Sequence, residues 1–203
     1  YYSKNGFDVL HVPNAINLDD FPKKAIKKFE KQIIFAGRLS KEKGIDVLLN
    51  TAKRLSPEYN LLILGTGPEE EKIRNISNSK ANVHYLGYQS KQNTISLIRG
   101  SDLLIQPSII EGISSTMLEA MGCETCIIAS NVGGNPELIE NNKTGVLVEP
   151  NNTEELVEKI SYLLMENEKR SAMAANGLKA VVKYDWKQIG KLYLDIYESP
   201  LHK

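Results

Sequence analysis

Short apolar runs alternate with helical patterns through most of the chain. Each run is rich in Leu, Ile or Val and apolar on both faces, which is typical of strands buried in a parallel sheet. The runs cover residues 32–36, 61–64, 83–86, 103–106, 126–129 and 146–148. Helical patterns fill the intervals, at residues 44–55, 69–77, 91–99, 116–121, 136–140 and 154–166. Six alternations of strand and helix predict a doubly wound α/β domain with a six-stranded parallel sheet and right-handed crossovers.

The two ends of the chain lack this alternation. Residues 9–12 are expected to form one more strand, as the last strand of a preceding domain, and the turn Pro13-Asn14-Ala15 follows it. Beyond the sixth strand the pattern predicts two helices without strands, at residues 169–183 and 185–198, with Asp185 as a candidate cap of the second.

Length and composition indicate one globular domain. The chain has 203 residues, of which 41% are hydrophobic and 25% are charged. No apolar run approaches the roughly 20 residues that a membrane helix needs. The chain begins at Tyr1 without a signal-peptide pattern, so we interpret it as a fragment. Its formal net charge is zero, which gives no global field to attract nucleic acid.

Five lysines crowd one short segment near the start of the chain. Glu30 alone interrupts them with a negative charge, and the interpretation we favour is a solvated linker or helix face. The alternative is a patch that touches anionic lipid or a phosphorylated acceptor. The five are Lys23, Lys24, Lys27, Lys28 and Lys31.

The two cysteines, Cys123 and Cys126, have C-x-x-C spacing. A redox dithiol would need a thioredoxin-like setting, and a zinc site would need more ligands. His11, His84 and His202 lie far from them in sequence and from each other. We expect both cysteines to pack as small hydrophobes, in keeping with a reducing compartment.

In open α/β sheets, ligands bind beyond the carboxyl ends of the strands. The loop after the first predicted strand, Gly37 to Gly44, carries two cations suited to phosphate. Arg38 can fork onto phosphate oxygens and Lys43 adds a point charge, while a helix N-terminus follows at Gly44. The alternative is a solvated loop that happens to be basic.

The loop after the second predicted strand is Gly65-Thr66-Gly67-Pro68. It resembles the start of a dinucleotide fingerprint, but Glu70 stands where the third glycine belongs, and the fingerprint belongs after the first strand. We therefore expect a glycine-rich turn that borders the cleft. After the fifth strand, Gly133 and Gly134 form either a tight loop or a close backbone approach to the same ligand.

The loop after the fourth predicted strand leads into a helix and carries two glutamates, Glu111 and Glu119. Ser114 or Ser115 can cap this helix, whose free N–H groups suit a diphosphate. The carboxylates would repel a diphosphate but accept hydrogen bonds from sugar hydroxyls. Acid, anion site and acid in this order fit a sugar, a diphosphate and a ribose. The alternative is one capping and one solvated carboxylate.

Four motifs in order resemble the retaining glycosyltransferases of the GT-B fold, the glycogen synthase and sucrose synthase relatives called family 4 or glycosyl transferases group 1. The likeness spans almost the whole chain. Its motifs are V-P-N-x-I-x at residues 12–17, G-R-L-x-x-x-K-G at 37–44, two glutamates eight residues apart at Glu111 and Glu119, and G-G-x-P-E at 133–137.

The resemblance implies the C-terminal, Rossmann-like half of a GT-B fold. Residues 1–31 would be an interdomain linker and N-terminal remnant, 32–184 the nucleotide-sugar-binding domain, and 185–203 a helix that crosses back to the missing acceptor domain. The implied function is transfer of a hexosyl group from a UDP- or GDP-sugar to a glycan or lipid-linked acceptor, in the cytoplasm or at the inner face of the membrane. The alternative is a catalytically silent sugar-nucleotide-binding domain that serves a protein partner.

The resemblance also implies roles for single residues. Arg38 and Lys43 would hold the diphosphate and stabilise the leaving group, Glu111 would contact the transferred sugar, and Glu119 would bind ribose hydroxyls. No metal or other cofactor is expected, because cationic side chains replace it. The implied catalytic residues are Glu111, Arg38 and Lys43, and the donor-binding residues are Gly37, Arg38, Lys43, Gly87, Tyr88, Glu111, Gly112, Ile113, Ser114, Ser115, Thr116 and Glu119.

The chain departs from the family pattern at three positions. Ile113 stands where an aromatic or bulky residue is common, Glu124 where glycine is common, and Asn17 where aspartate is common. Glu124 would be strained if its position requires a positive φ. These departures concern donor identity rather than the ability to bind a donor.

Overall fold

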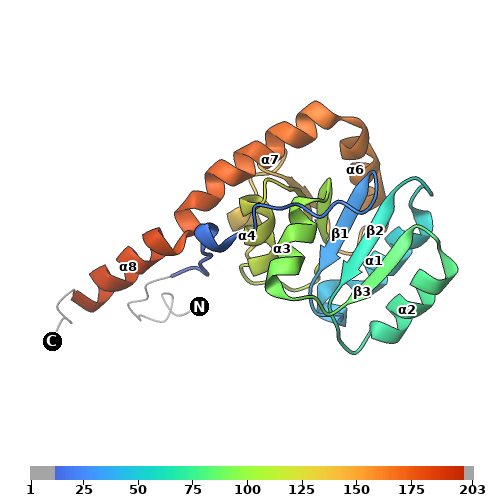
Figure 1. The fold of residues 1–203 in the computed structure, drawn as a ribbon, viewed down its shortest axis with the longest axis horizontal. Helices are drawn as coiled ribbons and strands as arrows, with labels where there is room; N and C mark the ends of the chain where they lie inside the picture. The colour runs from blue at the N-terminus through green and yellow to red at the C-terminus, as the bar shows by residue number, and fades with distance from the viewer. Residues whose placement is uncertain (1–11, 199–203) are drawn as a thin grey trace.

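A computed structural model describes residues 12–198 of the chain (Figure 1). Its centre is a six-stranded parallel sheet with the strand order β3-β2-β1-β4-β5-β6. This confirms the doubly wound α/β prediction. The direction of winding reverses between β1 and β4, which is where such sheets bind ligands. The strands are β1 Gln32–Ala36, β2 Asn60–Leu64, β3 Val83–Gly87, β4 Leu103–Gln106, β5 Cys126–Ser130 and β6 Val146–Val148.

The helices occupy the predicted intervals, with ends that differ by one to three residues. Residues 9–11 of the expected N-terminal strand lie outside the described residues, and Val12 is not in a strand. The helices are α1 Ile45–Arg54, α2 Glu70–Ser79, α3 Lys91–Arg99, α4 Ser115–Gly122, α5 Asn135–Leu138, α6 Thr153–Met165, α7 Asn167–Val181 and α8 Trp186–Glu198. Three 3-10 turns join them: η2 Leu18–Asp20, η3 Lys41–Lys43 and η4 Val182–Tyr184.

Both faces of the sheet are covered, which explains why the strands are apolar on both faces. Alternate residues of β1 enter different cores: Ile33 and Phe35 pack with α1, α2 and α6, whereas Ile34 and Ala36 pack with α3 and α4. Cys126 belongs to the first core and Cys123 to the second. Burial raises the pKa of each thiol to about 12, so both behave as small hydrophobes, as predicted.

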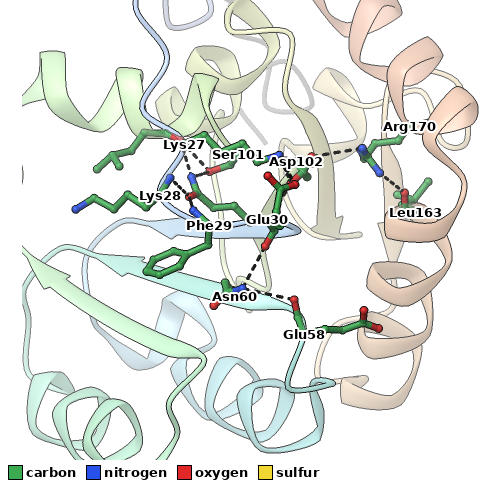
Figure 2. Close-up of polar contacts among 12 residues, drawn as sticks. Lys27, Lys28, Phe29, Glu30, Glu58, Asn60, Ser101, Asp102, Leu163 and Arg170 are labelled. Atoms are coloured by element: carbon green, nitrogen blue, oxygen red, sulfur yellow. Dashed lines mark hydrogen bonds and ion pairs between the residues drawn. The ribbon is translucent and has the colours of Figure 1, made fainter.

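At the amino ends of the strands, buried polar groups fasten the lysine-rich segment to the sheet (Figure 2). The side-chain oxygen of Gln32 accepts from the N–H of Lys28 at 2.9 Å. Asp102 accepts from the N–H of Gln32 at 2.8 Å and pairs with Lys27 at 3.3 Å and Arg170 at 3.4 Å. The segment is therefore an anchored, non-helical connection, which settles the choice between linker and helix face.

The last helix begins against the start of the described chain. Ile16 donates to Tyr184 at 3.0 Å and accepts from the N–H of Trp186 at 2.8 Å. Asp185 accepts from the N–H of Lys187 at 2.8 Å, which confirms it as the cap of α8. Figure 1 shows α8 extending away from the sheet, and Tyr197 near its end is 81% exposed.

Glu124 has a φ of 57°, the left-handed conformation that favours glycine. The residue ends the connection from α4 to β5, where its N–H donates to the carbonyl of Met121 at 3.1 Å. The predicted strain at this position is therefore present.

Candidate functional site

A cleft lies at the carboxyl ends of the first three strands. The part nearest β2 has a volume of about 480 Å³, and a smaller hollow of about 190 Å³ shares Gly37, Gly65 and Tyr88 with it. The smaller hollow reaches the first turn of α4 through Thr116. Both lie on the β1 side of the switch point, where the sheet topology predicts a ligand. Their combined lining is Ala36, Gly37, Arg38, Leu64, Gly65, Thr66, Gly67, Tyr88, Gln89, Thr94 and Thr116.

Arg38 and Lys43, the two cations of the first loop, have different surroundings. The guanidinium of Arg38 is exposed, lines the cleft, and makes no hydrogen bond or ion pair with any residue from 12 to 198. Lys43 ends η3 and directs its ammonium group toward Glu111. Gly44 follows with a φ of 71°, and a Cβ there would lie 1.8 Å from the carbonyl oxygen of Pro107. Glycine is thus required where this loop packs against the end of β4.

Glu111 is the centre of a buried polar cluster. Its side chain is 8% exposed, and both carboxylate oxygens accept from Lys43 Nζ at 2.7 Å. The Oε2 atom also accepts from Ser108 Oγ at 2.9 Å and from Gln106 Nε2 at 3.2 Å. The sequence analysis missed Gln106 and Ser108. The available signal was a glutamine that ends an otherwise apolar buried strand.

Glu119 lies apart from this cluster, on α4. Its carboxylate is partly buried and makes no hydrogen bond or ion pair within the described part of the chain. Burial raises the pKa of this carboxyl, and the positive charge of Lys91 opposes the shift. The carboxylate of Glu119 is therefore costly to ionise and available to a hydrogen-bond donor from a ligand.

The first turn of α4 presents backbone N–H groups beside the cleft. Ser114 caps the helix by accepting from the N–H of Met117 at 3.4 Å, as one of the two predicted alternatives. Ser115 is exposed, and Thr116 lines the smaller hollow. The N-terminal N–H groups of a helix are favourable partners for an anion.

Two further glycine pairs hold the loops of the site together. A Cβ on Gly65 would lie 1.9 Å from the carbonyl oxygen of Gly37, so the second loop packs directly on the first and borders the cleft, as predicted. Gly133, with a φ of 52°, and Gly134 pack against the loop of Glu111, where Gly134 N–H donates to the Glu111 carbonyl at 3.3 Å. The close approach of this second pair is to protein backbone.

The V-P-N turn supports the same loop from another side. The side-chain amide of Asn14 donates to the carbonyl of Ile113 at 2.8 Å. Backbone contacts from residues 99 positions apart in sequence therefore fix the path from Glu111 to α4.

The predicted donor-binding residues thus fall into three groups. Gly37, Arg38, Tyr88 and Thr116 line the cleft; Lys43 and Glu111 form the buried pair beside β4. The others do not line either hollow: Gly87, Gly112, Ile113, Ser114, Ser115 and Glu119. Gly87 has a φ of 65° and turns the chain toward Tyr88.

Among residues 12–198, no three His, Cys, Asp or Glu side chains gather as metal ligands would. The expectation of a donor site without metal stays a prediction. No helix within the same residues has both the length and the apolar character to cross a membrane.

The sheet order and the cleft at its switch point define a Rossmann-like domain of the GT-B glycosyltransferases. TarM from S. aureus, solved in complex with fondaparinux, alpha-GlcNAc-glycerol and UDP, shares this fold with a TM-score of 0.82 and 24% identity, over 97% of this chain and 41% of TarM. The chain belongs to the glycosyl transferases group 1 family, which matches residues 17–180.

Two curated relatives are 30% identical to the chain over 168 residues, which is 82% of its length. One is an uncharacterized glycosyltransferase of Methanocaldococcus jannaschii, of which 47% is covered. The other is the N,N'-diacetylbacillosaminyl-diphospho-undecaprenol alpha-1,3-N-acetylgalactosaminyltransferase of Campylobacter jejuni, of which 44% is covered. The chain therefore spans about half the length of these relatives.

Proposed function

We propose that this chain is the donor-binding domain of a retaining family 4 glycosyltransferase that uses a UDP- or GDP-sugar. The observation that carries the proposal is the cleft that joins an unpaired Arg38, an exposed Tyr88 and the first turn of α4 at Thr116. A cation, an aromatic ring and a helix N-terminus suit the diphosphate and base of a nucleotide sugar. The UDP in the TarM complex supports the same chemistry for a shared fold.

Each group of residues then has a role at one part of the donor. Arg38 and the first N–H groups of α4 hold the diphosphate, and Tyr88 lies against the base. Lys43 leaves Glu111 for the diphosphate and stabilises the negative charge of the leaving group. Glu111 contacts the transferred hexose, where its charge favours an oxocarbenium-like transition state. Glu119 accepts hydrogen bonds from the ribose, and no metal takes part.

The acceptor domain lies outside this chain in the proposal, and α8 crosses back to it. The acceptor is a glycan or a lipid-linked glycan, and the undecaprenol-linked name of the Campylobacter relative supports the second. The complete protein would then work in the cytoplasm, at the inner face of the membrane. The exposed Lys23, Lys24 and Lys28 support contact with anionic lipid there.

Isothermal titration calorimetry of this chain with UDP-glucose, UDP-N-acetylglucosamine, GDP-mannose and ADP-glucose tests donor binding. We expect weak binding of one uridine or guanosine compound. Arg38→Ala should weaken it at least about tenfold, because a charge-assisted contact to phosphate is lost. Lys53→Ala, which removes an exposed cation from α1, is the matched control and should leave the affinity unchanged. Absence of binding by all four compounds would contradict the proposal.

A further inference from the structure

We infer that Gln106 and Ser108 are positioning residues that fix one oxygen of the Glu111 carboxylate and leave the other for the transferred sugar. The inference rests on the proposed function, because it assumes that a sugar lies against Glu111. It concerns two residues that the sequence motifs do not include.

The contacts of the two carboxylate oxygens are unequal. Oε2 accepts from Ser108 Oγ at 2.9 Å, from Gln106 Nε2 at 3.2 Å and from Lys43 Nζ at 2.7 Å. Oε1 accepts from Lys43 alone, also at 2.7 Å. If Lys43 turns to the diphosphate, Oε2 keeps two donors while Oε1 keeps none among the described residues. Oε1 is then the oxygen that can accept from a sugar hydroxyl.

Both positioning residues are held rigidly below the site. Ser108 is fully buried and Gln106 is 1% exposed at the end of β4. Gln106 Nε2 also donates to Ser108 Oγ at 3.1 Å, so the two side chains and Oε2 form a closed triangle of hydrogen bonds. A carboxylate held by buried neighbours loses little conformational freedom when the sugar binds.

The buried amide is not explained by stability. Gln106 Oε1 is buried without a hydrogen-bond partner in the described structure, and an unsatisfied buried oxygen costs free energy. An apolar side chain would fill the end of β4 without that cost. Its Nε2 group, in contrast, serves the carboxylate directly, which favours a role at the site.

Two variants of the complete protein test this role: Ser108→Ala, which removes one donor, and Gln106→Met, which removes the other with little change in length. Each should lower kcat roughly tenfold, the size expected for a lost hydrogen bond to a charged group. Affinity for UDP or GDP without the sugar should stay within about twofold, because the nucleotide does not touch Glu111. Thr125→Val removes a buried hydroxyl that donates to Ile98 at 2.8 Å, far from the cleft, and should leave both quantities unchanged.

A double-mutant cycle separates positioning from a general effect on the fold. In a Glu111→Gln background, Ser108→Ala should cause no further loss of kcat, because its effect acts through the carboxylate. Equal losses in both backgrounds would overturn the inference, as would equal weakening of nucleotide and nucleotide sugar. Unfolding of both Ser108→Ala and Gln106→Met would assign the two side chains to stability and overturn it as well.

Failure of the proposed function would look different. The unmodified protein would then bind none of the nucleotide sugars and transfer no sugar, and the inference would fall with it. If the unmodified protein is active and the two variants retain full kcat, the inference alone is wrong.

Discussion

The two edges of the sheet treat their charged side chains in opposite ways. At the amino edge, Asp102 and Arg170 are about 15% exposed, and each is bonded to other parts of the chain (Figure 2). At the carboxyl edge, Arg38 lines an open cleft and the Glu119 carboxylate is partly buried, and neither has a hydrogen-bond partner among residues 12–198. Charges at the first edge hold the linker to the domain, whereas those at the second are available to a ligand.

Lys43 and Glu111 are the exception at the carboxyl edge, since they pair with each other in partly buried surroundings. In the proposed function this pair opens when the donor arrives. The comparison therefore predicts that substitutions at the amino edge lower stability and that those at the carboxyl edge lower activity.

The largest effect is expected for Glu111→Gln in the complete protein. Loss of the negative charge beside the transferred sugar should lower kcat about 100-fold, the scale of a removed electrostatic contact to a transition state. Steady-state kinetics with the donor identified by calorimetry measures it. Glu119→Gln is the control and should mainly raise the KM for the donor. Full activity of Glu111→Gln would remove its proposed role and favour a catalytically silent binding domain.

At the amino edge, Asp102→Ala should destabilise the domain by about 2 kcal/mol, because Arg170 and the N–H of Gln32 lose a partly buried acceptor. The midpoint of thermal unfolding should fall by roughly 4–8 °C. Differential scanning calorimetry measures this change. Affinity for the donor should stay the same once the domain is folded, and a specific loss of affinity would contradict the division between the edges.

Arg38→Ala should have the reverse signature. Its stability should change by no more than about 0.5 kcal/mol, because the guanidinium has no partner in the described structure. Its donor affinity should fall about tenfold. Thermal unfolding with and without donor separates the two effects, and a large loss of stability without donor would break the comparison.

The smallest effect concerns the pH dependence of stability at Glu119. Burial raises the pKa of this carboxyl, so the folded state binds its proton more tightly and stability is lost as pH rises through the folded pKa. Glu119→Gln should therefore raise the unfolding midpoint at pH 7, and the gain should vanish below the ordinary pKa of 4.5. A gain that persists unchanged at low pH would assign it to another cause.

Periodicity was sufficient to predict the sheet, since each strand is apolar on both faces and each interval is helical. Glu124 shows that a single departure from a family pattern can also be interpreted: a positive φ was expected there, and its φ is 57°. The end of α1 was predicted a residue too far, because Gly44 and Leu55 are caps outside the helix.

The site was predicted less completely, because sequence spacing does not show which side chains meet. Glu111 and Glu119 were expected to face one crevice, yet Glu111 is bonded to Lys43 and Glu119 is not. The contact from Asn14 to Ile113 and the triangle at Gln106 depend on the tertiary path of the loops. The roles of all these residues toward a donor remain predictions.

The central claim is that a sugar nucleotide binds at the carboxyl edge, and amide chemical-shift mapping tests it most directly. The isotope-labelled chain would be titrated with the compound that gives the largest heat in calorimetry. The account predicts shifts at Gly37, Thr66, Tyr88 and Thr116, with none at Asp102. Shifts confined to the amino edge around Asp102, or no shifts at all, would contradict it.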